Sequence, residues 1–201
     1  RKMRAPKVTL RAALAKETSM VEKHIISEFD KDLETIEAMI MKMGGLAEAS
    51  IADATRSFES RDIPLVEAVI ERDKLIDELE ASINAQALQV LALRSPNAVD
   101  LRLVLSVIKV SGNLERIGDY SKNMAKRTGM LLDLPDIENA GSSLRRLGRK
   151  VELMLKDALE AYIQRDPDLA EQVILQDNDV DQLYNGIFRQ FLTYMLSLIH
   201  I

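Results

Sequence analysis

The segment "RDIPLVEAVIERDKLIDELE", residues 61–80, returns later in the chain as "RDPDLAEQVILQDNDVDQLY", residues 165–184. Nine of the twenty aligned positions are identical at an offset of 104 residues. Two unrelated segments of this length would share about one or two, so the chain contains an internal duplication. The match extends backwards to Asp53 and Asp157. The fold is therefore expected to consist of one unit used twice.

The repeated unit is predicted to be three long helices. Residues 30–60 and 142–164 carry apolar side chains at helical spacing with charged residues between them. After each, an aspartate followed by a proline marks the start of a second helix, which in the first copy reaches about Leu93. Ser95 is the expected cap of a third helix, at about residues 96–128. Helices of about thirty residues are on the order of 45 Å long, and an antiparallel three-helix bundle buries their apolar stripes.

These patterns predict an all-α protein made of two tandem three-helix bundles. The opening residues are basic and free of acids until Glu17, so we expect a leader or a non-native extension before Met20. The predicted division of the chain is a leader at 1–19, a first repeat at 20–130, a linker at 131–141 and an incomplete second repeat at 142–201.

The duplication also predicts what the second repeat lacks. Asn97 opens the third helix of the first copy, and its counterpart 104 positions later is residue 201, the last one. We therefore expect the second bundle to be truncated, without its third helix: either the sequence is a fragment, or the closing "LSLIHI" is a non-native continuation. Such a bundle would leave an apolar groove open to solvent or to a partner, which favours association and leads us to expect a homodimer.

Composition excludes several classes of function. The chain has a net charge of −5 and no long basic run outside its first sixteen residues, which argues against nucleic-acid binding. It has no cysteine, which excludes thiolate metal sites. Its two histidines, His24 and His200, lie near the two ends of the chain, so a Ser-His-Asp triad is very poorly supported. The absence of cysteine fits a cytoplasmic protein. No stretch of eighteen apolar residues is free of charge, so no membrane span is expected.

Three pairs of acids at i, i+4 are the candidate functional residues. Side chains four residues apart lie about 6 Å from each other on one face of a helix, and two like charges there destabilise the helix unless a cation offsets them. Asp73 falls on or beside the apolar stripe of its helix, and both members of its pair recur in the second copy. The pairs are Asp73 with Asp77, Glu115 with Asp119, and Asp177 with Asp181.

Two interpretations of these acids stay open from the residues alone. In the first, the pairs lie on solvated faces and bind nothing, and Arg102 and Arg116 neutralise the acids nearby or contact a partner. In the second, two helices of one bundle bring their carboxylates together around a cation. Oxygen ligands without cysteine would then favour a hard ion such as Mg²⁺, Ca²⁺, Mn²⁺ or Fe³⁺.

The chain resembles the PhoU family in the stretches "FDKDLE" and "DLRLVLSVIKVSGNLERIGDYSKN", in its acidic pairs and in the duplicated three-helix unit. The resemblance implies two tandem three-helix bundles and a metal-binding E(D)xxxD motif, here Glu115 to Asp119. Asp73 and Asp77 match the acidic positions on the preceding helix, and Asp177 and Asp181 match their second-repeat counterparts. The metal would be iron, manganese, magnesium or zinc. The second E(D)xxxD motif would fall near position 219, outside this sequence.

The resemblance also implies a role without catalysis. A member of this family is expected to be a cytoplasmic negative regulator of the phosphate regulon. It would couple the phosphate ABC transporter, through its ATPase, to the sensor histidine kinase, modulate phosphate uptake, and reach the membrane only through those partners. The alternative from another class is a structural helical-repeat interaction protein with no metal site. A di-iron carboxylate enzyme is disfavoured, because neither histidine follows an acid by three residues.

Overall fold

The computed structural model describes residues 7–94, 96–132, 137 and 139–199, with side chains described between residues 28 and 197. These residues form five helices and no strand. The helices are α1 (Lys7–Ser60), α2 (Ile63–Arg94), α3 (Ala98–Met130), α4 (Ala140–Gln164) and α5 (Pro167–Ile199).

The duplication is visible in how the helices are joined. Arg61 and Arg165, which are 104 positions apart, both have left-handed backbone, with φ of 55° and 53°. Each ends the long first helix of its repeat. The aspartate that follows caps the next helix as predicted: Asp62 Oδ1 accepts from the Leu65 amide at 3.4 Å, and Asp166 Oδ1 from the Leu169 amide at 3.1 Å. The two turns therefore share one local structure.

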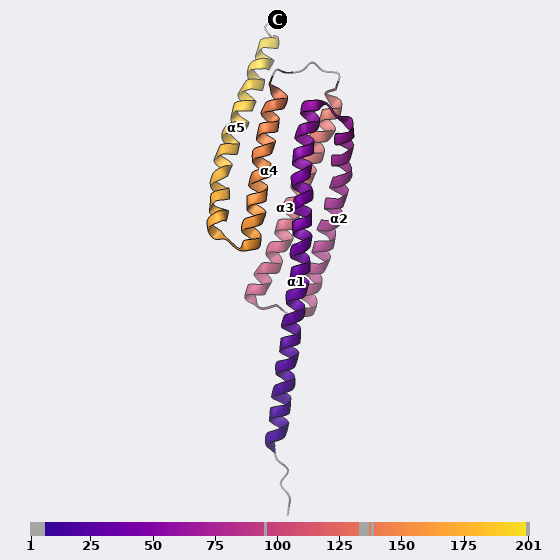
Figure 1. Ribbon diagram of the computed structural model, residues 1–201, viewed down its shortest axis with the longest axis vertical. Helices are drawn as coiled ribbons and strands as arrows, with labels where there is room; N and C mark the ends of the chain where they lie inside the picture. The colour runs from indigo at the N-terminus through magenta and orange to yellow at the C-terminus, as the bar shows by residue number, and fades with distance from the viewer. Residues whose placement is uncertain (1–6, 95, 133–136, 138, 200–201) are drawn as a thin grey trace, which may run out of the picture.

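Two predicted helix starts were wrong. The third helix begins at Ala98, because the Asn97 side chain accepts from the amides of Val99 and Asp100 and so forms the cap. Ser95, the expected cap, lies outside the described residues. The first helix begins at Lys7 rather than near residue 30. Its N-terminal part extends beyond the ends of α2 and α3 (Figure 1).

The helices α1, α2 and α3 form the predicted first bundle (Figure 1). Apolar side chains from all three helices meet in one core and are almost completely shielded from solvent. Burial of such side chains contributes about 1.5–3 kcal/mol each, which makes this core the main stabilising element. Its largest fully buried members are Ile36, Ile40, Met43, Ile76, Ile83, Val104 and Val107.

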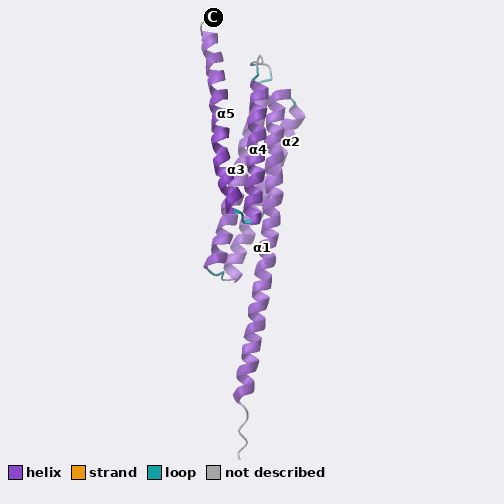
Figure 2. Ribbon diagram, turned by 60° about the vertical axis from the view of Figure 1, so that its left-hand side comes forward, coloured by secondary structure: helices purple, strands orange, loops and turns teal. Residues whose placement is uncertain are grey.

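The second repeat is attached through α4, which packs along α1. Leu155 and Leu159 of α4 join the core of the first bundle. A Cβ at Gly148 would overlap the side chain of Thr55 on α1, so glycine allows the two helices to approach closely. Among the described helices, α5 packs against α4 alone and lies on the side of α4 away from the first bundle (Figures 1 and 2).

The two-helix second repeat fits the predicted truncated bundle. Positions on α5 that face solvent include large apolar side chains, among them Ile174, Leu175, Phe188 and Met195, each at least half exposed. No described helix is long and apolar enough to cross a membrane.

Candidate functional site

The structure brings the two acidic pairs of the first repeat together. Asp73 and Asp77 lie on α2, and Glu115 and Asp119 lie on the neighbouring part of α3. Lys122 joins the two helices: its Nζ atom is 2.5 Å from Asp73 Oδ2 and 2.5 Å from Asp119 Oδ1. The predicted convergence of acids from two helices is therefore present, with a lysine ammonium between two of them. We call these four acids and Lys122 the acidic cluster.

Asp73 is the buried member of the acidic cluster. It lies on the apolar stripe of α2, as expected, and is only 3% exposed. Gly118 faces it from α3, where an added Cβ would lie 3.0 Å from Ile76 Cδ1 and 3.4 Å from Asp73 Oδ1. The absence of a side chain at Gly118 therefore allows α3 to approach the aspartate closely. Asp73 Oδ1 is buried and has no hydrogen-bond partner.

Crowding of carboxylates determines the electrostatics of the acidic cluster. Partial burial, followed by repulsion from Asp73, Asp119 and Glu80, raises the pKa of Asp77. Partial burial and the charge of Asp119 likewise raise the pKa of Glu115. The hydrogen bond from Lys122 lowers the pKa of Asp119. The cluster thus holds more negative charge than its one lysine neutralises.

The chemistry of these oxygen donors suits a hard cation, but their arrangement is not yet that of a metal site. Among the described residues, no three side chains of Asp, Glu, His or Cys are placed so that they could hold a metal ion. Lys122 occupies the space where a cation would contact both Asp73 and Asp119. The metal role of the predicted ligands stays a prediction.

The acidic pair of the second repeat does not join the cluster. Asp177 and Asp181 lie on α5 and are exposed to solvent. Asp177 is the counterpart of the buried Asp73, but no described helix packs over it in the way that α3 covers Asp73. The metal role of this pair also stays a prediction.

Lys122 is the residue that sequence reasoning missed. The expected counter-charges were Arg102 and Arg116, and within the described residues neither forms an ion pair with the four acids. Arg116 donates to Tyr120 Oη at 3.3 Å, and Arg102 lines a separate pocket between α1, α3 and the second repeat. The signal in the sequence was the spacing of Lys122, three residues after Asp119 and therefore on the same helical face.

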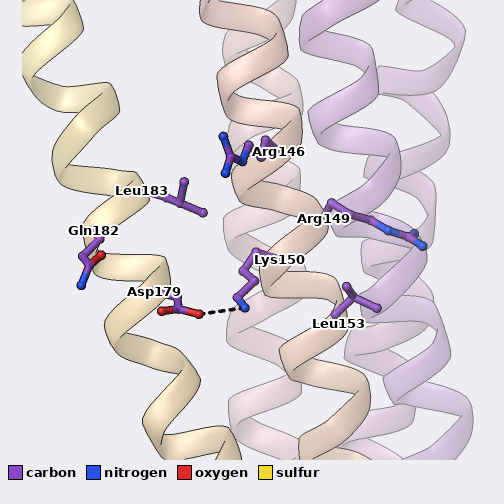
Figure 3. A pocket seen from close by; sticks show the side chains of 7 residues that line it. All are labelled: Arg146, Arg149, Lys150, Leu153, Asp179, Gln182 and Leu183. Atoms are coloured by element: carbon purple, nitrogen blue, oxygen red, sulfur yellow. Dashed lines mark ion pairs between the residues drawn. The ribbon is translucent and has the colours of Figure 1, made fainter.

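A second polar feature lies between α4 and α5 (Figure 3). This basic groove has a volume of about 630 Å³. Lys150 forms an ion pair with Asp179 across it at 3.0 Å. Arg149 pairs with Glu152 on its own helix, and Arg146 has no ion pair among the described residues. The residues that line the basic groove are Arg146, Arg149, Lys150, Leu153, Asp179, Gln182 and Leu183.

The duplication indicates which side of the second repeat carries this groove. Its lining positions on α4 and α5 correspond, at the offset of 104, to positions on the outer seam between α1 and α2. Four of these seven positions are exposed in the first bundle although its third helix is present, and the other three, Leu46, Ala49 and Leu79, are partly buried. The basic groove therefore lies on the side turned away from the position of a third helix. The exposed counterparts are Lys42, Gly45, Leu75 and Glu78.

Comparison with known proteins gives one consistent result. The family model described as PhoU domain matches residues 40–128 and 144–200, one segment in each repeat. A protein of Caulobacter vibrioides named phosphate-specific transport system accessory protein PhoU homolog is 38% identical over 175 residues, which cover 87% of this chain and 76% of that protein. The phosphate-specific transport system accessory protein PhoU of Escherichia coli is 38% identical over 177 residues, covering 88% and 73%.

Solved structures agree with the sequence matches. The crystal structure of PhoU from Pseudomonas aeruginosa superposes with a TM-score of 0.80 at 34% identity, over 84% of this chain and 81% of that one. The similarity in three dimensions thus extends through both repeats.

Proposed function

This chain belongs to the PhoU family, and from that membership we propose that it is a negative regulator of phosphate uptake and of the phosphate regulon. The observation that carries the proposal is the family match in both repeats together with relatives named as accessory proteins of phosphate-specific transport. An accessory role requires binding surfaces and no turnover of a substrate. We propose that the protein acts as an adaptor in the cytoplasm, without enzymatic activity.

Its proposed partners are the ATPase of the phosphate ABC transporter and the sensor histidine kinase. An adaptor of this kind keeps the kinase signal off while the transporter has phosphate, and it reaches the membrane through these partners. The proposed functional form is a homodimer. Support for association comes from the exposed apolar side chains of α5, because large apolar patches on a surface mark interaction sites.

The basic groove between α4 and α5 is the surface that we assign to one partner contact. Its three cations stand out in a chain of net charge −5, and Arg146 has no ion pair among the described residues. Leu153 and Leu183 add apolar area beside the charges. This combination suits an acidic segment with apolar side chains, since opposite charge guides association and apolar contact supports it.

Cation binding is the second part of the proposal. The carboxylates of Asp77 and Glu115 repel neighbouring acids and receive no ion pair from a described lysine or arginine, which favours a hard divalent cation beside them. When bound, such an ion would supply charge neutralisation between α2 and α3. Asp73 and Asp119 would complete the donor set.

Deleting the gene tests the regulatory part of the proposal. Expression of a phosphate-starvation promoter is measured in phosphate-rich medium, with and without a plasmid copy of the gene. The proposal predicts that the promoter switches on in the deletion strain and off again on complementation. A promoter that stays off in the deletion strain would remove the adaptor role.

A further inference from the structure

Lys122 gives the acidic cluster a cation that belongs to the chain itself. Its ammonium group contacts one carboxylate on each helix, Asp73 on α2 and Asp119 on α3. It is three residues after Asp119 on α3, so the two side chains lie on the same face of the helix. A dissolved metal ion would have to displace it from both oxygens.

Asp73 shows why this lysine matters for the fold. Its side chain is 4% exposed, and Lys122 is its one hydrogen-bond partner among the described residues. Its second oxygen, Oδ1, is buried and unpartnered. A buried, charged carboxylate without a counter-charge is strongly destabilising, so a cation beside Asp73 stabilises the packing of α2 against α3.

The remaining acids show what a lysine cannot do. One ammonium group neutralises one charge, whereas four acids of the cluster and the nearby Glu80 supply up to five. Lys122 contacts the buried Asp73 and the more exposed Asp119. It has no ion pair with Asp77 or Glu115 among the described residues. Lys122 therefore supplies the counter-charge of the buried Asp73, and Asp77 and Glu115 keep their own charges without an ion pair to it.

We propose that Lys122 is a built-in competitor of metal at the acidic cluster, which makes the first bundle stable without metal and keeps its affinity for divalent ions low. This inference rests on the proposed cation binding of the same carboxylates. It adds that the Lys122 side chain determines how tightly the acidic cluster binds a divalent ion. Removing Lys122 should convert the cluster from a site that tolerates metal into one that requires it.

The test compares thermal unfolding and Mn²⁺ titration calorimetry for the full chain and its variants. The variants are Lys122→Met, which removes the charge, and Lys122→Gln, which keeps a neutral donor if the methionine variant fails to fold. Lys109→Met removes an exposed lysine of α3 that lies 13 residues before Lys122, and it is the matched control. Each protein is melted in EDTA and in MnCl₂.

The inference expects the unmodified chain and Lys109→Met each to melt at the same temperature in both buffers. Lys122→Met or Lys122→Gln should melt roughly 5 °C lower in EDTA, recover that loss in MnCl₂, and bind Mn²⁺ roughly tenfold more tightly than the unmodified chain. If the unmodified chain binds Mn²⁺ and the Lys122 variants bind it no more tightly, the inference fails and the proposed cation binding stands. If no protein binds Mn²⁺, the inference and the cation part of the proposed function both fail, while the deletion experiment still judges the regulatory part.

Discussion

Gly148 of α4 lies directly against the side chain of Thr55 on α1, and this contact joins the two repeats. A β-carbon at position 148 would overlap Thr55 Cγ2 and Oγ1, whose hydroxyl donates to the Ile51 carbonyl oxygen at 2.9 Å within α1. At this point, the close approach of α1 and α4 therefore requires a glycine at position 148. It positions the basic groove relative to the acidic cluster.

Replacing Gly148 tests this interface. Gly148→Val should lower the free energy of unfolding by about 1–3 kcal/mol, because the added atoms force α4 away from α1. Urea denaturation of the full chain measures the change. Gly45→Ala is the matched control, since nothing lies within 4 Å of a Cβ there, and it should leave stability equal or raise it by about 0.5–1 kcal/mol. Equal effects of the two substitutions would refute the packing account.

A contact between the first and second helices of each repeat offers a second prediction. Arg72 Nη2 is 2.8 Å from Asp53 Oδ2, and 104 positions later Gln176 Nε2 is 3.1 Å from Asp157 Oδ2. The second contact lacks the ion pair. Gln176→Arg should therefore stabilise the second repeat by about 0.2–1 kcal/mol, because a charge-assisted bond replaces a neutral donor.

The reverse substitution, made in the first repeat, should weaken the corresponding contact. Arg72→Gln should cost about 1–2 kcal/mol, since both side chains are largely buried and the charge-assisted bond weakens. Chemical denaturation of each variant beside the unmodified protein gives both values. A destabilising Gln176→Arg would show that the two repeats do not share this contact geometry.

The acidic cluster predicts a specific dependence on pH. The pKa values of Asp77 and Glu115 are raised in the folded protein by partial burial and by neighbouring acids. A carboxyl group with a raised pKa contributes stability below its unfolded pKa and loses it as the pH rises through the folded value. Asp77→Asn and Glu115→Gln should therefore stabilise the protein at neutral pH by roughly a few tenths of a kcal/mol, with the gain fading towards pH values of about 4.

Removing the charge of Asp119 is expected to change stability in the opposite direction, so this residue serves as the control for the pH dependence. The hydrogen bond from Lys122 lowers its pKa, so its contribution is present above the unfolded pKa and is lost as the pH falls through the folded one. Asp119→Asn should destabilise at neutral pH, and the difference should shrink in acid. Thermal melts between about pH 4 and neutral pH show whether each variant is stabilised or destabilised. A change in the same direction for all three variants would contradict the described charge pattern.

Reversing charge in the basic groove tests the assigned partner surface. Arg146→Glu combined with Lys150→Glu should weaken co-purification with the phosphate-transporter ATPase or the sensor kinase by roughly tenfold, because the docking segment is expected to be acidic. Arg189→Glu, an exposed cation of α5 outside the groove, should leave binding unchanged. Unchanged binding of the double variant would remove the groove from the account.

The fold was largely predictable because it depends on patterns repeated along the chain. Helical spacing, the aspartate caps at residues 62 and 166 and the offset of 104 predicted three helices per repeat and the two-helix second repeat. The start of the third helix was missed by two residues. Two polar residues flank Pro96, and only the structure shows that the Asn97 side chain makes the capping bonds.

The site was only partly predictable for a physical reason. Spacing on a helix places Asp73 and Asp77 on one face, and the apolar stripe predicted the burial of Asp73. The choice of counter-charge depends on the rotation of α3 relative to α2, which no local pattern specifies. Arg116 lies beside Glu115 in sequence but turns to Tyr120, while Lys122 reaches across to Asp73.

The most direct test of the acidic cluster is a double-mutant cycle between Asp73 and Lys122. The free energies of unfolding of Asp73→Asn, Lys122→Met, the double variant and the unmodified chain are measured by urea denaturation in EDTA at neutral pH. The account predicts a coupling of about 1–3 kcal/mol, with the double variant far less destabilised than the sum of the single ones. Additive effects would mean that the lysine does not neutralise the buried aspartate, and would contradict the account.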